Sequence, residues 1–327
     1  MTSAPAASIT RRSVLSGIAA AVAASPLEAW SLPEAVPIID SHMHLFDPTR
    51  PQGAPYRGPE TSIYYRTGAS PETYSRVARR DGVIGAIAVE ASPWIEDNLW
   101  VLETAQRAEI IVATIGNLRP EAAEFPEYLE RYHRNPLFRG IRYGNIWDYD
   151  IVAQSTQARF LAGLKLLAQG DLALDTANPR IDLLQAVVRI SDVVPELRIV
   201  INHLPKLEPT AAEAADYAAV LREISQRPNL FVKLSAVIHA VGGRASTKLV
   251  DHKDRLDMLW DLFGDDRVMF GSDWPTIEWD APVHSEFAIM RAYLAGKVCA
   301  QHEKFFWRNS MKAYKWTPRT EAQWRLK

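Results

Sequence analysis

Short apolar runs alternate with longer amphipathic stretches from residue 36 onward. The runs are rich in β-branched residues and apolar at successive positions, which is typical of parallel strands buried on both faces. They predict eight strands, over residues 36–40, 83–89, 110–115, 140–143, 172–174, 198–202, 230–234 and 268–270.

The stretches between these runs carry apolar residues at spacings of three and four, the period of an amphipathic helix. They predict helices over residues 71–80, 97–108, 120–133, 158–169, 180–193, 210–226 and 252–263. Eight strands that alternate with helices are typical of a (β/α)8 TIM barrel, because doubly wound sheets usually contain fewer strands. We therefore predict an α/β fold with one barrel domain over residues 36–327.

The first 29 residues have the pattern of an export signal. Arg11 and Arg12 precede an uncharged, alanine-rich run over residues 14–24, which is too short to span a bilayer. This order resembles a bacterial twin-arginine signal peptide, with cleavage after Ala24 or near Ala29. We expect export through the Tat translocase and a periplasmic location, without stable membrane association afterwards.

Composition narrows the class of partner. The 37 Lys and Arg residues nearly balance 39 Asp and Glu, so no basic field favours nucleic acid, and a small molecule is the expected partner. The single cysteine, Cys299, excludes an internal disulfide and a cysteine-based zinc cluster. Histidine and carboxylate groups are therefore the available strong metal ligands.

Candidate catalytic side chains follow three predicted strands. His42 and His44 end the first strand two residues apart, so they share one face, while His203 follows the sixth strand and Asp273 the eighth. Strand ends converge in a parallel barrel, and this is the rim where barrel enzymes place their active sites. These four residues suit one Zn²⁺ or Mn²⁺ per chain. Taken singly, each also fits a buried structural histidine or an Asp that caps a helix.

Further rim residues have the chemistry of substrate contacts. Arg142 ends the fourth strand, where its guanidinium can hold a carboxylate or a polarised oxygen, and Glu90 follows the second strand. Trp94 and Trp274 also follow strands and can stack against a flat ring. The irregular stretch over residues 45–70, after the first strand, is expected to form a lid or rim. The alternatives are a rim salt bridge for Arg142, a structural hydrogen bond for Glu90, and loop packing for the tryptophans.

Six short motifs occur in a specific order along the chain. Together they resemble the amidohydrolase superfamily, in particular the amidohydrolase-2 branch with its sugar lactonases and dicarboxylate lactonases. The motifs lie at residues 39–44, 138–142, 199–203, 232–235, 270–275 and 309–314. The resemblance implies a (β/α)8 barrel with His42, His44, His203 and Asp273 in the family's metal-binding or catalytic positions. The branch also contains lactonases that work without a metal.

The leading hypothesis is a hydrolase that opens a small lactone or cyclic ester, derived from a sugar or an aromatic compound. Asp273 and His203 are the predicted catalytic residues, and Asp273 moves the proton of the attacking water with or without a metal. One alternative is a metal-dependent decarboxylase of aromatic acids, although such relatives typically carry Glu-x-His where this chain has His42-x-His44. Another is a non-catalytic periplasmic binding protein. The role of His239 stays open.

Overall fold

The computed structural model describes residues 1–2, 36–241 and 244–327. The predicted twin-arginine motif, the alanine-rich run and both cleavage sites lie outside the described residues, so export and a periplasmic location stay predictions. Among the described residues, no helix is both long and apolar enough to cross a membrane.

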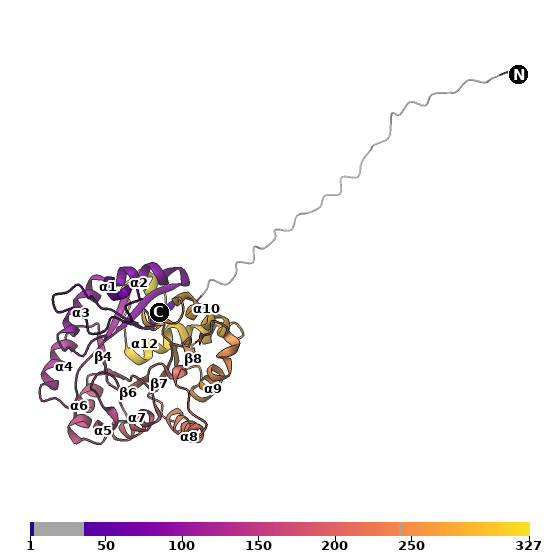
Figure 1. The fold of residues 1–327 in the computed structure, drawn as a ribbon. Helices are drawn as coiled ribbons and strands as arrows, with labels where there is room; N and C mark the ends of the chain where they lie inside the picture. Colours follow the sequence, from indigo (N-terminus) through magenta and orange to yellow (C-terminus); the bar gives the residue numbers. More distant parts are fainter. Residues whose placement is uncertain (3–35, 242–243) are drawn as a thin grey trace. The chain divides into compact units, whose positions relative to one another are not determined.

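In the described part of the chain, eight parallel strands form one sheet that curls into a barrel, which confirms the predicted fold. Each strand pairs with the next in sequence, and helices surround the strands (Figure 1). The strands are β1 (Ile38–His44), β2 (Val83–Val89), β3 (Ile111–Gly116), β4 (Phe138–Arg142), β5 (Ala173–Asp175), β6 (Arg198–Ile201), β7 (Leu230–Leu234) and β10 (Val268–Phe270). A two-stranded ladder of β8 (Ala240–Val241) and β9 (Arg244–Ala245) lies apart from this sheet.

The first and last strands close the barrel at the rim that carries the predicted site. Backbone hydrogen bonds run from His44 N to Trp274 O, at 2.8 Å, and from Asp273 N to His42 O, at 2.9 Å. A Cβ on Gly271 would lie 2.8 Å from the Cβ of His42, so the approach of the two segments requires glycine there. β1 also extends to His44 rather than ending at residue 40, because its pairing with β2 continues as far as His44 and Val89.

The predicted helices are present, with ends shifted by a few residues, and they follow the strands around the barrel. They are α2 (Pro71–Ala78), α3 (Asp97–Arg107), α4 (Phe125–His133), α6 (Ala158–Gln169), α7 (Ile181–Val193), α8 (Ala214–Ser225) and α9 (Lys253–Phe263). The sequence pattern did not indicate α10 (Val283–Leu294), because its apolar residues cover most of its surface and leave no clear polar face.

The chain ends in a set of short helices that pack against the barrel. They are α11 (Cys299–Glu303), the π-helical η5 (Lys304–Arg308), α12 (Asn309–Tyr314) and α13 (Glu321–Trp324). The Asn309 amide donates to the backbone oxygens of Asp265 and Val268, each at 2.7 Å. The Tyr314 hydroxyl reaches Asp175 at the end of β5. The C-terminal segment therefore supports the polar layer beneath the site.

Candidate active site

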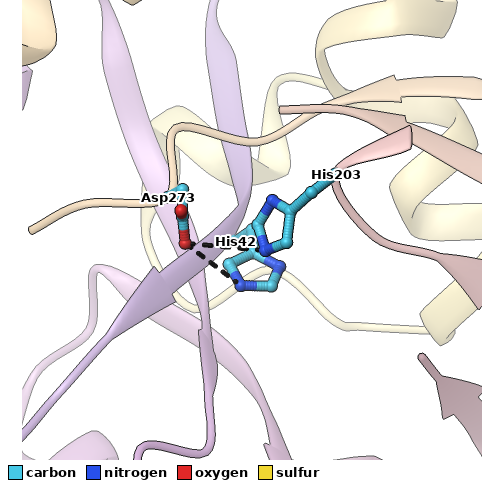
Figure 2. A group of neighbouring side chains, drawn as sticks. All are labelled: His42, His203 and Asp273. Carbon is cyan, nitrogen blue, oxygen red and sulfur yellow. Dashed lines mark ion pairs between the residues drawn. The ribbon is translucent and has the colours of Figure 1, made fainter. Parts of the chain in front are cut away.

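The four residues predicted as ligands or catalysts meet at one carboxylate oxygen. Oδ1 of Asp273 lies 3.6 Å from Nε2 of His42, 3.3 Å from Nε2 of His44 and 3.6 Å from Nε2 of His203. Figure 2 shows Asp273 facing the His42 and His203 rings. Residues far apart in sequence thus form one compact cluster at the carboxyl ends of β1, β6 and β10.

Two of these side chains are directed toward the cluster by unusual backbone conformations. His203 has φ of 56° and Asp273 has φ of 60°, in the left-handed region that non-glycine residues rarely occupy. Such conformations cost about 1–3 kcal/mol each and are concentrated at functional sites. Both residues come within three positions of a strand end, so the turn redirects each side chain at the rim.

Asp40 fixes the relative position of the two strand ends. Its Oδ1 accepts hydrogen bonds from the backbone N–H of His42, at 3.0 Å, and of Ser272, at 2.8 Å. Its Oδ2 accepts from the hydroxyl of Tyr74 at 2.5 Å. Because Asp40 is fully buried, these donors replace its hydration, and burial raises the pKa of its carboxyl group. Asp40 is a positioning residue for the histidine pair and for the Asp273 segment.

Each histidine ring is oriented by a different partner at Nδ1. Nδ1 of His44 lies 3.0 Å from the backbone oxygen of Val89, and Nδ1 of His203 lies 2.9 Å from Oγ of Ser235. Nδ1 of His42 instead lies 3.3 Å from the ammonium of Lys233. A carbonyl oxygen can only accept, so His44 donates from Nδ1, and its Nε2 atom faces the site.

The site combines neutral imidazoles with an ionised carboxylate. Burial lowers the pKa of His42 well below its usual value, and it lowers the pKa of His203 to about 3 although Asp273 opposes that shift. Burial alone raises the pKa of Asp273, but His203 and His44 outweigh it and the pKa falls to about 2. Near neutral pH, Asp273 is therefore an anion able to accept a proton.

A cavity of about 150 Å³ opens in front of this cluster. Four of the candidate residues line it, namely His44, Arg142, His203 and Asp273. The lining residues that the sequence analysis missed or assigned only to the rim are Tyr56, Ala91, Ile146, Trp147, Ala177, Asn178, Lys206 and Thr276. No sequence signal marks most of them, since loops of different strands bring them together.

Arg142 reaches the cavity as part of a buried ion pair. Its Nε donates to Oε1 of Glu90 at 2.5 Å, and its Nη2 donates to the backbone oxygen of Glu90 at 2.8 Å. The indole N–H of Trp147 donates to Oε2 of Glu90 at 3.1 Å. Glu90 therefore lies behind Arg142 and holds it, rather than lining the cavity.

The stretch over residues 45–70 crosses the rim and is anchored on both sides. Arg50 forms a bidentate ion pair with Asp97, at 2.9 and 3.1 Å, at the start of α3. At the other side, the Tyr56 hydroxyl is hydrogen-bonded to Oγ1 of Thr276. Tyr56 also lies against His44, with ring centroids 5.7 Å apart. The stretch therefore forms part of the pocket wall, as the prediction of a rim expected.

Comparison with known proteins assigns this arrangement to a family. The family model described as amidohydrolase matches residues 39–316. The chain belongs to the amidohydrolase family. An L-fucono-1,5-lactonase of Burkholderia ambifaria is 29% identical over 246 residues, covering 72% of this chain and 80% of that protein. An L-fucono-1,5-lactonase of Burkholderia multivorans is 26% identical over 281 residues, covering 82% of this chain and 92% of that protein.

A solved structure extends the likeness to the whole barrel. The crystal structure of an amidohydrolase from Burkholderia multivorans with bound zinc has a TM-score of 0.75 and 23% identity, covering 86% of this chain and 100% of that one. At this level of identity the likeness supports the fold.

The donor set of this amidohydrolase fits one divalent ion. One ligand atom each of His42, His203 and Asp273 lies within 4.8 Å of the others. Two imidazoles and one carboxylate are a set that suits zinc and similar ions. The fourth predicted ligand, His44, is adjacent, with its Nε2 3.3 Å from that of His42. The site is thus a candidate metal centre of the His/His/Asp type.

The two tryptophans predicted as substrate contacts lie away from the cavity of the amidohydrolase, and so does His239, whose role the sequence left open. Trp274 is fully buried, and its indole N–H donates to the hydroxyl of Tyr64 at 3.2 Å. The prediction of Trp274 as a substrate contact is corrected, because the residue after Asp273 turns into the core. Trp94 is 36% exposed and does not line the cavity. His239 donates from Nδ1 to the backbone oxygen of Val237 at 2.9 Å and is also outside the lining.

Proposed function

We propose that this amidohydrolase hydrolyses a small, uncharged lactone of the sugar type to the open hydroxy acid. The observation that carries the proposal is the ionised Asp273, whose Oδ1 lies within 3.6 Å of three imidazole nitrogens beside a cavity of about 150 Å³. The two relatives named L-fucono-1,5-lactonase support this reaction class.

Asp273 serves as the general base. It takes one proton from a water molecule while the water oxygen forms a bond to the lactone carbonyl carbon. When the ring C–O bond breaks, Asp273 returns that proton to the leaving alkoxide. The guanidinium of Arg142, held by Glu90, polarises the carbonyl oxygen and stabilises the negative charge that develops on it.

His203 completes the catalytic pair. It faces Asp273 from the end of β6, lines the cavity, and keeps its ring orientation through Ser235. His42, His203 and Asp273, with His44 beside them, would hold one Zn²⁺ or Mn²⁺. Such an ion lowers the pKa of a bound water and polarises a carbonyl.

Charge balance supports an uncharged substrate. Arg142 is neutralised by Glu90 within one buried pair, whose side chains are 5% and 4% exposed. Lys206 lines the exposed edge of the cavity and lowers the pKa of Asp273, so its charge is offset by that carboxylate. A dicarboxylate lactone would bring two negative charges to a wall without two unpaired cations.

The test is a pH-drop assay of the purified mature protein with uncharged sugar lactones and with a pyrone dicarboxylate lactone. We expect faster acid release from the sugar lactones. Spontaneous opening is measured in the same buffer without protein. Faster hydrolysis of the dicarboxylate would contradict the substrate class, and CO₂ release from aromatic acids without ring opening would favour a decarboxylase. Elemental analysis of never-chelated protein then determines which metal, if any, accompanies the activity.

A further inference from the structure

A lysine inside the barrel contacts the site from below. Lys233 lies on β7, and its side chain is fully buried. Its ammonium lies 2.8 Å from Oδ2 of Asp175 on β5 and 3.3 Å from Nδ1 of His42 on β1. The lysine is outside the cavity lining, so it does not contact substrate. It can act only through its neighbours.

The ammonium of Lys233 is held by two residues. Asp175 supplies the opposite charge, and its other oxygen, Oδ1, accepts a hydrogen bond from the Tyr314 hydroxyl at 2.8 Å. The ring of Tyr314 also lies under the ammonium, with Nζ 5.1 Å from its centroid. The ammonium keeps its position, because leaving Asp175 would leave a buried charge without its partner.

This contact determines the direction of a chain of hydrogen bonds. An ammonium group has donors and no acceptor, so Nδ1 of His42 accepts from Lys233 through its lone pair. A neutral His42 ring must then carry its hydrogen on Nε2, which lies 3.3 Å from Nε2 of His44. His44 donates from Nδ1 to a carbonyl oxygen, so its Nε2 is an acceptor. Every donor in this chain thus meets an acceptor.

His42 therefore differs from its two neighbours. Nδ1 of His44 faces a carbonyl oxygen, and Nδ1 of His203 faces a hydroxyl. Each of these oxygen atoms can accept a hydrogen bond from the ring. Those rings can keep the hydrogen on Nδ1 and direct the Nε2 lone pair to a metal. For His42 to do the same, its Nδ1 hydrogen would have to face the ammonium of Lys233, and two donors would be opposed.

We propose that Lys233 is a positioning residue that holds His42 in the tautomer with hydrogen on Nε2, and that it thereby weakens metal binding at this site. His42 then donates from Nε2 toward Nε2 of His44. The inference concerns the site of the proposed function, but its test needs no substrate, so the two can fail separately.

The experiment is nitrogen NMR of the metal-free mature protein with ¹⁵N-labelled histidine, with the His42 signals assigned through a His42→Gln variant. We expect His42 to show a protonated Nε2 and an unprotonated Nδ1. The variant that tests the cause is Lys233→Met with Asp175→Asn, which removes both buried charges together and avoids an unpaired one. In it, the His42 tautomer should shift toward Nδ1–H.

Zinc affinity gives the second readout, measured by competition with a chromophoric chelator. The double variant should bind zinc about tenfold more tightly than the wild type, the lower end of the range for changes to the partners of metal ligands. The matched control is Lys206→Met, which removes a lysine near Asp273 that does not contact His42. It should leave the His42 tautomer unchanged.

Two results would overturn the proposal. One is a wild-type His42 that carries its hydrogen on Nδ1 in the metal-free protein, which needs no variant to fold. The other is a folded double variant in which both the tautomer and the zinc affinity equal those of the wild type.

Discussion

The two walls of the cavity are built differently. On the wall formed by β1 and β10, backbone hydrogen bonds between His44 and Trp274 and between Asp273 and His42 set the spacing of the site. On the wall formed by β2 and β4, side chains do this work, since Glu90 holds Arg142 through an ion pair and Trp147 through its indole.

The position of the first wall depends on backbone hydrogen bonds, whereas that of the second depends on contacts between buried side chains. A change of side chain on the first wall removes a reacting group while the backbone ladder persists. A change on the second wall disturbs its neighbours, because each polar group there depends on another buried side chain for its partner. On the first wall a substitution should therefore lower activity more than stability. On the second wall it should lower stability more than activity.

The largest expected effect is on the first wall. Asp273→Asn removes the base but keeps the shape of the residue, so kcat should fall about 10²–10⁴-fold, the usual contribution of a positioned base. The barrel should still fold, because backbone atoms form the hydrogen bonds between β1 and the segment after β10. Initial rates of lactone opening and circular dichroism measure the two quantities. An unchanged rate would show that Asp273 is not the base.

The next effect is on the second wall and concerns stability. Glu90→Gln leaves the guanidinium of Arg142 buried without a carboxylate, and breaking a buried ion pair in this way costs about 3–5 kcal/mol. Urea unfolding measures the loss. The matched control is Glu130→Gln, which breaks an exposed pair with Arg134 at 2.6 Å and should change the unfolding free energy little. Equal losses in the two variants would show that the buried pair stabilises the fold no more than an exposed pair does.

A smaller effect is expected for the indole on the same wall. Trp147→Phe removes the N–H that donates to Glu90 but keeps an aromatic face beside the cavity. The loss of unfolding free energy should be about 1 kcal/mol, the typical net value of one hydrogen bond. Trp94→Phe is the control, since Trp94 lies outside the cavity lining. A loss as large as that of Glu90→Gln would mean that Trp147 and Glu90 act as one unit.

An effect of pH on stability is expected for a carboxyl group that supports backbone. Glu286 on α10 is fully buried and accepts from the N–H groups of Val237, at 2.9 Å, and Ile238, at 3.1 Å, in the segment after β7. Burial raises its pKa to about 8, from an ordinary value of 4.5. Between these values the folded state binds a proton that the unfolded state does not, so this group makes the protein less stable as the pH rises.

The measurement for Glu286 is the unfolding free energy of the wild type minus that of Glu286→Gln, determined from about pH 5 to about pH 8. Because glutamine does not titrate, the difference should decrease across this range. A difference that is constant with pH would show that the Glu286 carboxyl has the same pKa in the folded and unfolded states.

The strands and the cluster of histidines with Asp273 were predictable for the same physical reason. Parallel strands buried on both faces need long apolar runs, and those runs also mark where each strand ends. His42, His44, His203 and Asp273 stand at such ends, so a barrel topology was enough to bring them together. Predicting this cluster required no knowledge of the loop conformations.

Other parts of the site could not be read in this way. Trp274 follows a strand just as Asp273 does, yet it turns into the core, since adjacent side chains leave the backbone in different directions. Tyr56 reaches the cavity from a stretch without periodic pattern, and its position depends on Thr276, 220 residues away. The π-helical segment near the C-terminus likewise has no distinct apolar period.

The sequence by itself determined the barrel, because its order of apolar runs and amphipathic stretches permits few other packings, and it determined which reactive groups stand at the strand ends. Only the tertiary structure decided what each group does. The hydrogen-bonding role of His42 depends on Lys233, 191 residues away, and that of Arg142 on Glu90, 52 residues away. Hydrogen-bond direction and burial are properties of neighbours in space, and folding alone selects those neighbours.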